Sequence, residues 1–180
     1  MLAIGCVLLG SAASSALAAA KVKVFFERDD RLQTVERAVP DGGDRLQVAV
    51  TALFRGPNAI ERRDGIRSAI PKRVVVQEIL VANGVAFLRL PETFAVGGAG
   101  DIVDLRLAQI AHTVTGAADV AGVRILLGDE AVPAPGSDPG AVITLGSLTK
   151  REIIGPVPVG ITALQRRLVQ LRYLSANAVN

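Results

Sequence analysis

His112 is the single histidine of the chain, so it is the one imidazole available for acid–base chemistry near neutral pH. A catalytic histidine needs a nucleophile or an acidic group within hydrogen-bond reach. The sequence supplies Ser68 and several aspartates, but it contains no G-x-S-x-G nucleophile motif. We therefore interpret His112 as a structural or partly exposed residue and predict no catalytic residue. A hydrolase that acts through His112 is the least favoured hypothesis.

Cysteine and aspartate give little basis for a metal site. The single cysteine, Cys6, excludes an intrachain disulfide and a cysteine-based zinc site, and the single histidine excludes a multi-histidine site. Asp29 with Asp30 and Asp41 with Asp44 form two acidic pairs, but they lack EF-hand spacing and its final glutamate. Turn and helix-cap roles suffice for these four residues, so we predict no metal site.

A glycine-rich segment, residues 97–100, precedes a predicted helix and could cradle an anion through its backbone N–H groups. It lacks the Lys-Ser/Thr pair of a P-loop and does not follow a clear dinucleotide-binding βα unit. We interpret it as a flexible loop and predict no cofactor.

The most basic segment lies between the first predicted helix and the third predicted strand. Its five cations are Arg62, Arg63, Arg67, Lys72 and Arg73. Because arginine forks bind carboxylate and phosphate, this group could face an anionic polymer or the acidic surface of a partner. Glu61 and Asp64 lie in the same segment, and we favour a solvated loop that they partly neutralise.

The composition is that of one globular domain. Of the 180 residues, 50% are hydrophobic, 21% charged and 3% aromatic, and the formal net charge is +3. Nucleic-acid binders concentrate their basic residues and stack bases on aromatic side chains, whereas here the charges are scattered and tryptophan is absent. We therefore predict no nucleic-acid partner.

The first 20 residues predict a cleaved export signal. They carry no charge, residues 2–9 are nearly all apolar, and residues 16–20 have the small-x-small pattern that signal peptidase accepts. Two alternatives stay open: an uncleaved membrane anchor, and a lipid on Cys6 within a segment that faintly resembles a lipoprotein box. We expect a secreted or extracytoplasmic protein of the cell envelope, with membrane contact only through an uncleaved or lipidated N-terminus.

The periodicity of the remaining chain predicts the elements that must position these residues. We expect helices from Asp44 to Gly56 and from Asp101 to Gly116, each with one apolar face. Strands are predicted at residues 22–26, 32–39, 74–80, 85–90 and 123–127, with a hairpin turn at Asn83-Gly84. The order β-β-α-β-β-α-β predicts an α+β fold with two amphipathic helices packed on one face of a mixed β-sheet.

The second predicted helix carries polar residues away from its apolar stripe. The stripe consists of Val103, Leu107, Ile110, Ala111 and Val114. Arg106 and Gln109 point toward another side. Gln109 and Thr113 are one helical turn apart, and contact with a partner and internal packing explain them equally well.

Several short motifs together resemble the GerM domain family of sporulation and spore germination. They are Leu32 to Arg37 before a proline, Leu53-Phe54-Arg55-Gly56-Pro57, Gly65 to Pro71, Asn83-Gly84-Val85-Ala86, Ala108 to Thr115, and Val120-Ala121-Gly122-Val123. Their order and spacing extend the resemblance from Val22 to about Val132. The resemblance implies a domain that associates with like domains, because GerM folds are similar to ring-building motifs.

The C-terminal residues carry a second resemblance. Residues 160–174 are similar to the first helix of a three-helix peptidoglycan-binding module, although Arg172 stands where that family usually has glycine. We expect a signal peptide at residues 1–20, a GerM-like domain with an edge extension at 21–150, and a linker with the start of the incomplete module at 151–180. Truncation of a longer cell-wall protein explains the missing helices most simply.

These observations favour a non-catalytic, exported interaction module of the cell envelope. The resemblance links it to sporulation, germination or peptidoglycan assembly. We expect its partners to be peptidoglycan or another cell-wall polymer, and envelope proteins that include like domains. The alternative is the N-terminal targeting portion of a cell-wall enzyme, an L,D-transpeptidase or an amidase, with its catalytic domain beyond residue 180.

Overall fold

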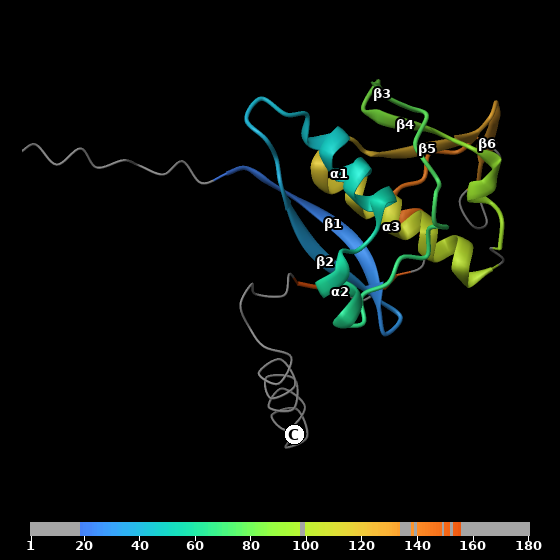
Figure 1. Ribbon diagram of the computed structural model, residues 1–180. Helices are drawn as coiled ribbons and strands as arrows, with labels where there is room; N and C mark the ends of the chain where they lie inside the picture. The colour runs from blue at the N-terminus through green and yellow to red at the C-terminus, as the bar shows by residue number, and fades with distance from the viewer. Residues whose placement is uncertain are drawn as a thin grey trace, which may run out of the picture.

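The computed structural model describes residues 19–97, 100–133, 138, 140–148, 150, 151 and 153–155 (Figure 1). Nearly all of the predicted export signal, including Cys6, lies outside the described residues. The predicted peptidoglycan-binding helix, residues 160–174, also lies outside them. In the part of the chain that the structure describes, no helix combines the length and the apolar character needed to cross a membrane.

The first sheet is built on a long hairpin. Strands β1 (Lys21–Arg28) and β2 (Arg31–Ala38) pair antiparallel along their whole length. Asp29 and Asp30 both have positive φ, 53° and 61°, and form the two-residue turn that was predicted to be polar. A third strand, β7 (Ile153–Ile154), pairs parallel with β2, so these two residues of the predicted linker belong to this sheet.

Helix α1 (Arg45–Arg55) confirms the two end signals that the sequence carries. The Asp44 carboxylate accepts hydrogen bonds from the backbone N–H groups of Leu46 (2.8 Å) and Gln47 (3.2 Å). Gly56 ends the helix with a φ of 82°, a conformation that favours glycine. The helix packs on β1 and on α3 (Asp101–Ala117) through its apolar face, Leu46, Ala49, Val50 and Leu53.

The second sheet has the strand order β3-β4-β5-β6. Its strands are β3 (Glu78–Ala82), β4 (Val85–Leu90), β5 (Gly122–Leu127) and β6 (Glu130–Val132). Asn83 and Gly84 form the turn between β3 and β4, as predicted, whereas the strand predicted from residue 74 begins only at Glu78. The β4–β5 pair is parallel and its two neighbours are antiparallel, so the sheet is mixed.

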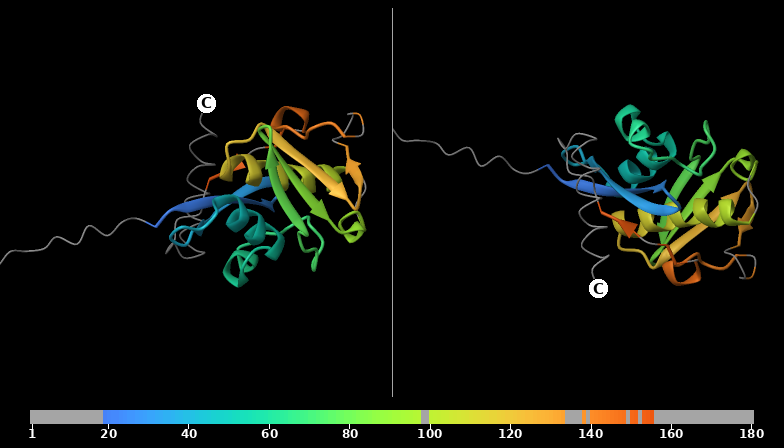
Figure 2. Two further views of the ribbon diagram at one scale, coloured as in Figure 1. Left: turned by 90° about the horizontal axis from the view of Figure 1, so that it is seen from above. Right: turned by 90° about the horizontal axis from the view of Figure 1, so that it is seen from below.

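The fold is α+β, but the prediction of a single sheet is wrong. The strands form two separate sheets, and α3 packs against β1 of the first and β5 of the second (Figures 1 and 2). Because strands of both sheets pack against this helix, α3 buries residues outside its apolar stripe as well. The helix also continues through Gly116, which was predicted to end it and which lies against the ring of Phe25.

The segment between α1 and β3 is more ordered than the sequence indicated. The sequence analysis assigned no helix or strand to residues 58–70, yet they contain α2 (Ala59–Arg63). Asn58 and Glu61 form a capping box, the N-x-x-E signal that would have located this helix. Two short 3₁₀ helices, η1 (Glu92–Phe94) and η2 (Leu145–Ser147), complete the elements. Ile143 bridges to Val123 of β5 and is fully buried, so this part of the chain packs on the same domain.

Candidate functional site

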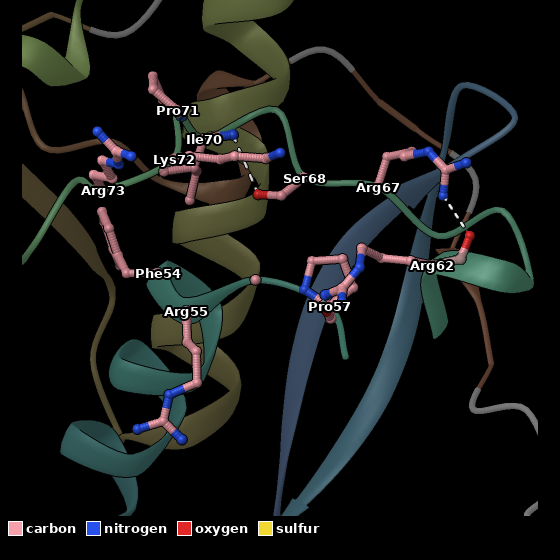
Figure 3. A pocket seen from close by; sticks show the side chains of 11 residues that line it. Phe54, Arg55, Pro57, Arg62, Arg67, Ser68, Ile70, Pro71, Lys72 and Arg73 are labelled. Atoms are coloured by element: carbon pink, nitrogen blue, oxygen red, sulfur yellow. Dashed lines mark hydrogen bonds between the residues drawn. The ribbon is translucent and has the colours of Figure 1, made fainter. Parts of the chain in front are cut away.

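A pocket of about 350 Å³ lies where the end of α1, α2 and the segment after α2 meet (Figure 3). It is lined by Phe54, Arg55, Gly56, Pro57, Arg62, Arg67, Ser68, Ile70, Pro71, Lys72 and Arg73. Four of the five cations singled out in the sequence therefore line one cavity. Arg63 does not line it, and Arg55, which the sequence analysis did not select as a site residue, does.

A second pocket of about 320 Å³ adjoins the first. It is lined by Arg37, Ala52, Arg55, Gly56, Pro57, Asn58, Ala59 and Arg62. The two pockets share Arg55, Gly56, Pro57 and Arg62. We call the two pockets together the basic groove.

The charge of the basic groove is not balanced by its own lining. Neither pocket is lined by an aspartate or a glutamate. Within the described ranges, no ion pair joins Arg55, Arg62, Arg67, Lys72 or Arg73 to a carboxylate. The groove therefore presents five positive charges that are not neutralised by its lining residues.

Of the two carboxylates that were predicted to partly neutralise this segment, Glu61 is paired with a cation of another element. The Glu61 carboxylate accepts two hydrogen bonds of 2.7 Å from the Arg37 guanidinium, a bidentate pair across to β2. It also accepts the backbone N–H of Asn58 at 2.8 Å in the capping box. Glu61 is thus committed to the start of α2 and to Arg37, which lines the second pocket. Within the described residues, it forms no ion pair with the other five groove cations.

Backbone contacts fix two of the groove arginines. Arg62 donates a hydrogen bond to the carbonyl of Pro57. Arg67 donates to the carbonyls of Arg62 (2.6 Å) and Ile66 (3.0 Å). Its own backbone forms a bridge with Glu27 of β1, through two hydrogen bonds of 2.8 Å. Each guanidinium has five N–H donors, so both side chains are held in place while other donors stay available.

Two buried polar residues of α3 form hydrogen bonds with the segment that follows α2. Arg106 donates to the carbonyls of Ala69 (2.8 Å), Phe94 (2.7 Å) and Val96 (3.1 Å), and burial lowers the pKa of its guanidinium. Gln109 accepts the backbone N–H of Ala69 at 3.0 Å. The helix therefore fixes the chain at Ala69, two residues after Arg67 and three before Lys72.

Gln109 and Thr113 are internal packing residues. Both side chains are fully buried, and the Thr113 hydroxyl accepts the backbone N–H of Phe25 at 3.0 Å. This outcome excludes the alternative that they contact a partner. Arg106, Gln109 and Thr113 are spaced three and four residues apart, so they lie on one face of the helix beside its apolar stripe. This spacing is the signal that the helix has more than one buried face.

His112 has the surroundings of a structural residue. It is half-buried beside Phe25, with the two ring centroids 5.3 Å apart, and burial lowers the pKa of its imidazole. Among the described residues, no hydrogen bond links His112 to Ser68 or to a carboxylate, and the Ser68 hydroxyl accepts the backbone N–H of Ile70 at 3.2 Å. The described geometry offers His112 no nucleophile to activate.

The other sequence candidates have local roles or lie outside the described chain. Asp29 and Asp30 form the β1–β2 turn and Asp44 caps α1. No cluster of three or more His, Cys, Asp or Glu residues that could hold a metal ion is found in the described part of the chain. Gly98 and Ala99 of the glycine-rich segment lie outside it, and Gly100 is the N-cap of α3 without a side-chain cap.

The fold and the groove define a small α+β domain with a depression lined by cations. Residues 23–133 match the Germane family model, described as sporulation and spore germination. The match covers more than half of the chain, which therefore belongs to this family, and the predicted resemblance is confirmed. No curated protein matches the sequence.

Three solved structures share the fold. The tandem GerMN domains of the sporulation protein GerM from Bacillus subtilis have 18% identity and a TM-score of 0.53, over 79% of this chain and 51% of that one. The first GerMN domain of the same protein has 12% identity and a TM-score of 0.53, over 69% and 94%. A Clostridium perfringens protein described as a lipoprotein has 17% identity and a TM-score of 0.50, over 84% and 99%. This chain thus spans about half of the tandem-domain structure.

Proposed function

We propose that this protein is a non-catalytic, exported interaction module of the bacterial cell envelope, linked to sporulation, germination or peptidoglycan assembly. The observation that carries the proposal is its membership of the sporulation and spore germination family over residues 23–133. The uncharged, apolar first 20 residues support export, because a sequence of this kind directs a chain across the membrane. Its proposed partners are a cell-wall polymer, such as peptidoglycan, and envelope proteins that include like domains.

A binding role accounts for the chemistry of the described residues better than catalysis does. The one histidine packs on Phe25, and the first pocket of the basic groove is lined by cations without a histidine, an aspartate or a glutamate that could act as a general base. Such a cavity can hold an anion, but it has no group suited to removing a proton at neutral pH.

Export can be tested by shaving intact cells with a protease that does not cross the membrane. The chain is expressed in a bacterial host with a C-terminal tag, and the matched control carries Leu8→Arg and Leu9→Arg in the apolar run. We expect the tag to be lost only from the unmodified chain, because two arginines disrupt the apolar segment of the signal. A tag that survives in both strains contradicts the proposal.

The same strains distinguish the two forms of the N-terminus. A Cys6→Ser variant removes the sulfur on which a lipid would be attached. If the signal is cleaved without lipidation, the variant and the unmodified chain are found in the same fraction. If only the unmodified chain sediments with membranes, Cys6 carries a lipid and the simple secretion that we favour is wrong.

A further inference from the structure

We propose that the basic groove binds the phosphodiester backbone of an anionic cell-wall polymer. The anion site follows from the groove itself, whereas the choice of a cell-wall polymer rests on the proposed function. Nothing in the family description assigns a ligand to this surface.

The shape of the groove favours a narrow ligand. Two adjoining pockets of about 350 and 320 Å³ share four lining residues, so one extended molecule can occupy both. Volumes of roughly 300–1,000 Å³ are typical of ligand pockets, whereas protein partners commonly meet flatter surfaces. A linear polymer with a charge on each unit suits two adjoining pockets of this kind.

The charges favour a ligand with repeated anionic groups. Arg55, Lys72 and Arg73 form no hydrogen bond or ion pair through their side chains within the described residues, and all three are exposed. Arg62 and Arg67 are held by backbone carbonyls, so little conformational freedom is lost when their free N–H groups bind an oxyanion. The cations repel one another until such a ligand neutralises them.

The turn that carries Arg73 supports a binding role. Arg73 has a φ of 70°, a left-handed conformation that is uncommon for a residue with a side chain. Backbone strain of this kind persists where the surrounding structure holds it and is concentrated at ligand sites. The turn projects Lys72 and Arg73 from consecutive positions at the edge of the groove.

A cell-wall polymer joined by phosphodiesters is favoured over single-stranded nucleic acid and over an acidic protein. Phe54 is the one aromatic residue in the lining of either pocket, so the groove lacks a series of rings on which bases could stack. The arginine fork matches the oxygens of a phosphate, and a phosphodiester keeps its charge at any physiological pH. An acidic polypeptide is the alternative ligand, and the experiment below compares it with the phosphate polymer.

The test measures binding of the purified chain to poly(glycerol phosphate) by calorimetry at 0.15 M NaCl. The groove variant is Arg55→Gln with Lys72→Gln, and the control variant is Lys23→Gln with Arg45→Gln. Both control residues are exposed and lie outside the two pockets, and both variants lose two positive charges. Arg45 begins α1, about 15 Å along the helix axis from Arg55.

We expect the groove variant to bind at least about tenfold more weakly than the unmodified chain, and the control variant to stay within about twofold of it. Equal losses in the two variants would overturn the proposal, because they would show that net charge alone attracts the polymer. Absence of binding by the unmodified chain would also overturn it. Circular dichroism verifies that both variants keep the fold.

Two further ligands identify the source of the anion. Inorganic phosphate at a matched phosphate concentration should compete weakly, since it cannot span both pockets. If it displaces the polymer completely, the groove is a site for a single small anion and the polymer proposal is wrong. Polyglutamate of the same charge should bind more weakly, and tighter binding would replace the proposal with an acidic protein partner. These assays do not depend on export, so failure of the groove and failure of the proposed function are distinguishable.

Discussion

Arg106 is only 4% exposed, and its guanidinium donates to three backbone carbonyls, those of Ala69, Phe94 and Val96. Replacement by leucine would leave these acceptors without their donor in a buried site. We expect Arg106→Leu to lower the free energy of unfolding by about 2–4 kcal/mol, measured by urea denaturation. The exposed Arg45→Leu should change it by less than about 0.5 kcal/mol. Similar values for the two variants would contradict the role assigned to Arg106.

His112 makes the stability of the domain depend on pH. Burial lowers the pKa of its imidazole below the ordinary value of 6.5, so the unfolded chain binds a proton more readily than the folded one. The stability from neutral His112 is therefore complete above pH 6.5 and is lost as the pH falls through 6.5 toward the folded-state pKa. We expect the free energy of unfolding to fall in that window, and His112→Gln to flatten the profile. An unchanged slope in the variant would contradict this assignment.

At the scale of single residues, the sequence identified most of the groove but not its balance of charge. Arg62, Arg67, Lys72 and Arg73 stand close together in the chain, so their shared surface was predictable. Glu61 could not be assigned from composition, because its partner, Arg37, lies 24 residues away on another element. Arg55 was missed because it is the last residue of α1, and the sequence does not show that this helix end lies beside the basic segment.

Among the elements, α3 carries the core of both sheets. Leu107 is fully buried on it, whereas Ile102, one and a half turns earlier on the same helix, is 48% exposed. We expect Leu107→Asp to abolish folding or to cost more than about 4 kcal/mol, because it buries a carboxylate without a partner. Ile102→Asp, with the same change of residue type, should cost less than about 1 kcal/mol. Circular dichroism with urea denaturation of both variants checks this pair.

A substitution in the turn before β3 can weaken binding without lowering the stability of the domain. Arg73→Gly removes a groove cation and places glycine where φ is 70°. We expect the free energy of unfolding to equal that of the parent or to exceed it by up to about 1 kcal/mol. Binding of poly(glycerol phosphate) should be weaker. Unaltered binding would contradict the role of Arg73, and a clear loss of stability would contradict the account of strain in this turn.

Signals in neighbouring residues predicted single helices, strands and turns, but they did not predict how these elements pack together. The Asp44 cap and the Asn83-Gly84 turn depend on neighbouring residues, and both were found. Periodicity indicates which face of an element is buried but not which element covers it. Arg106, Gln109 and Thr113 mark a second buried face on α3, and this helix packs against a strand of each of the two sheets.

For the whole molecule, the position of charge matters more than its total. A formal net charge of +3 is small and would attract any polyanion weakly at low salt. Five of the positive charges line one pocket that contains no carboxylate, and this concentration is what can produce binding that survives physiological salt. We therefore propose that this chain holds a cell-wall polymer in the basic groove.

Retention on insoluble cell-wall sacculi that keep their phosphate polymers tests this claim most directly. The purified chain, the Arg55→Gln/Lys72→Gln variant and the Lys23→Gln/Arg45→Gln control are washed at low and at moderate salt. We predict that at moderate salt the chain and the control variant stay bound while the groove variant is washed off. Loss of all three at moderate salt, or equal retention of all three, would contradict the account.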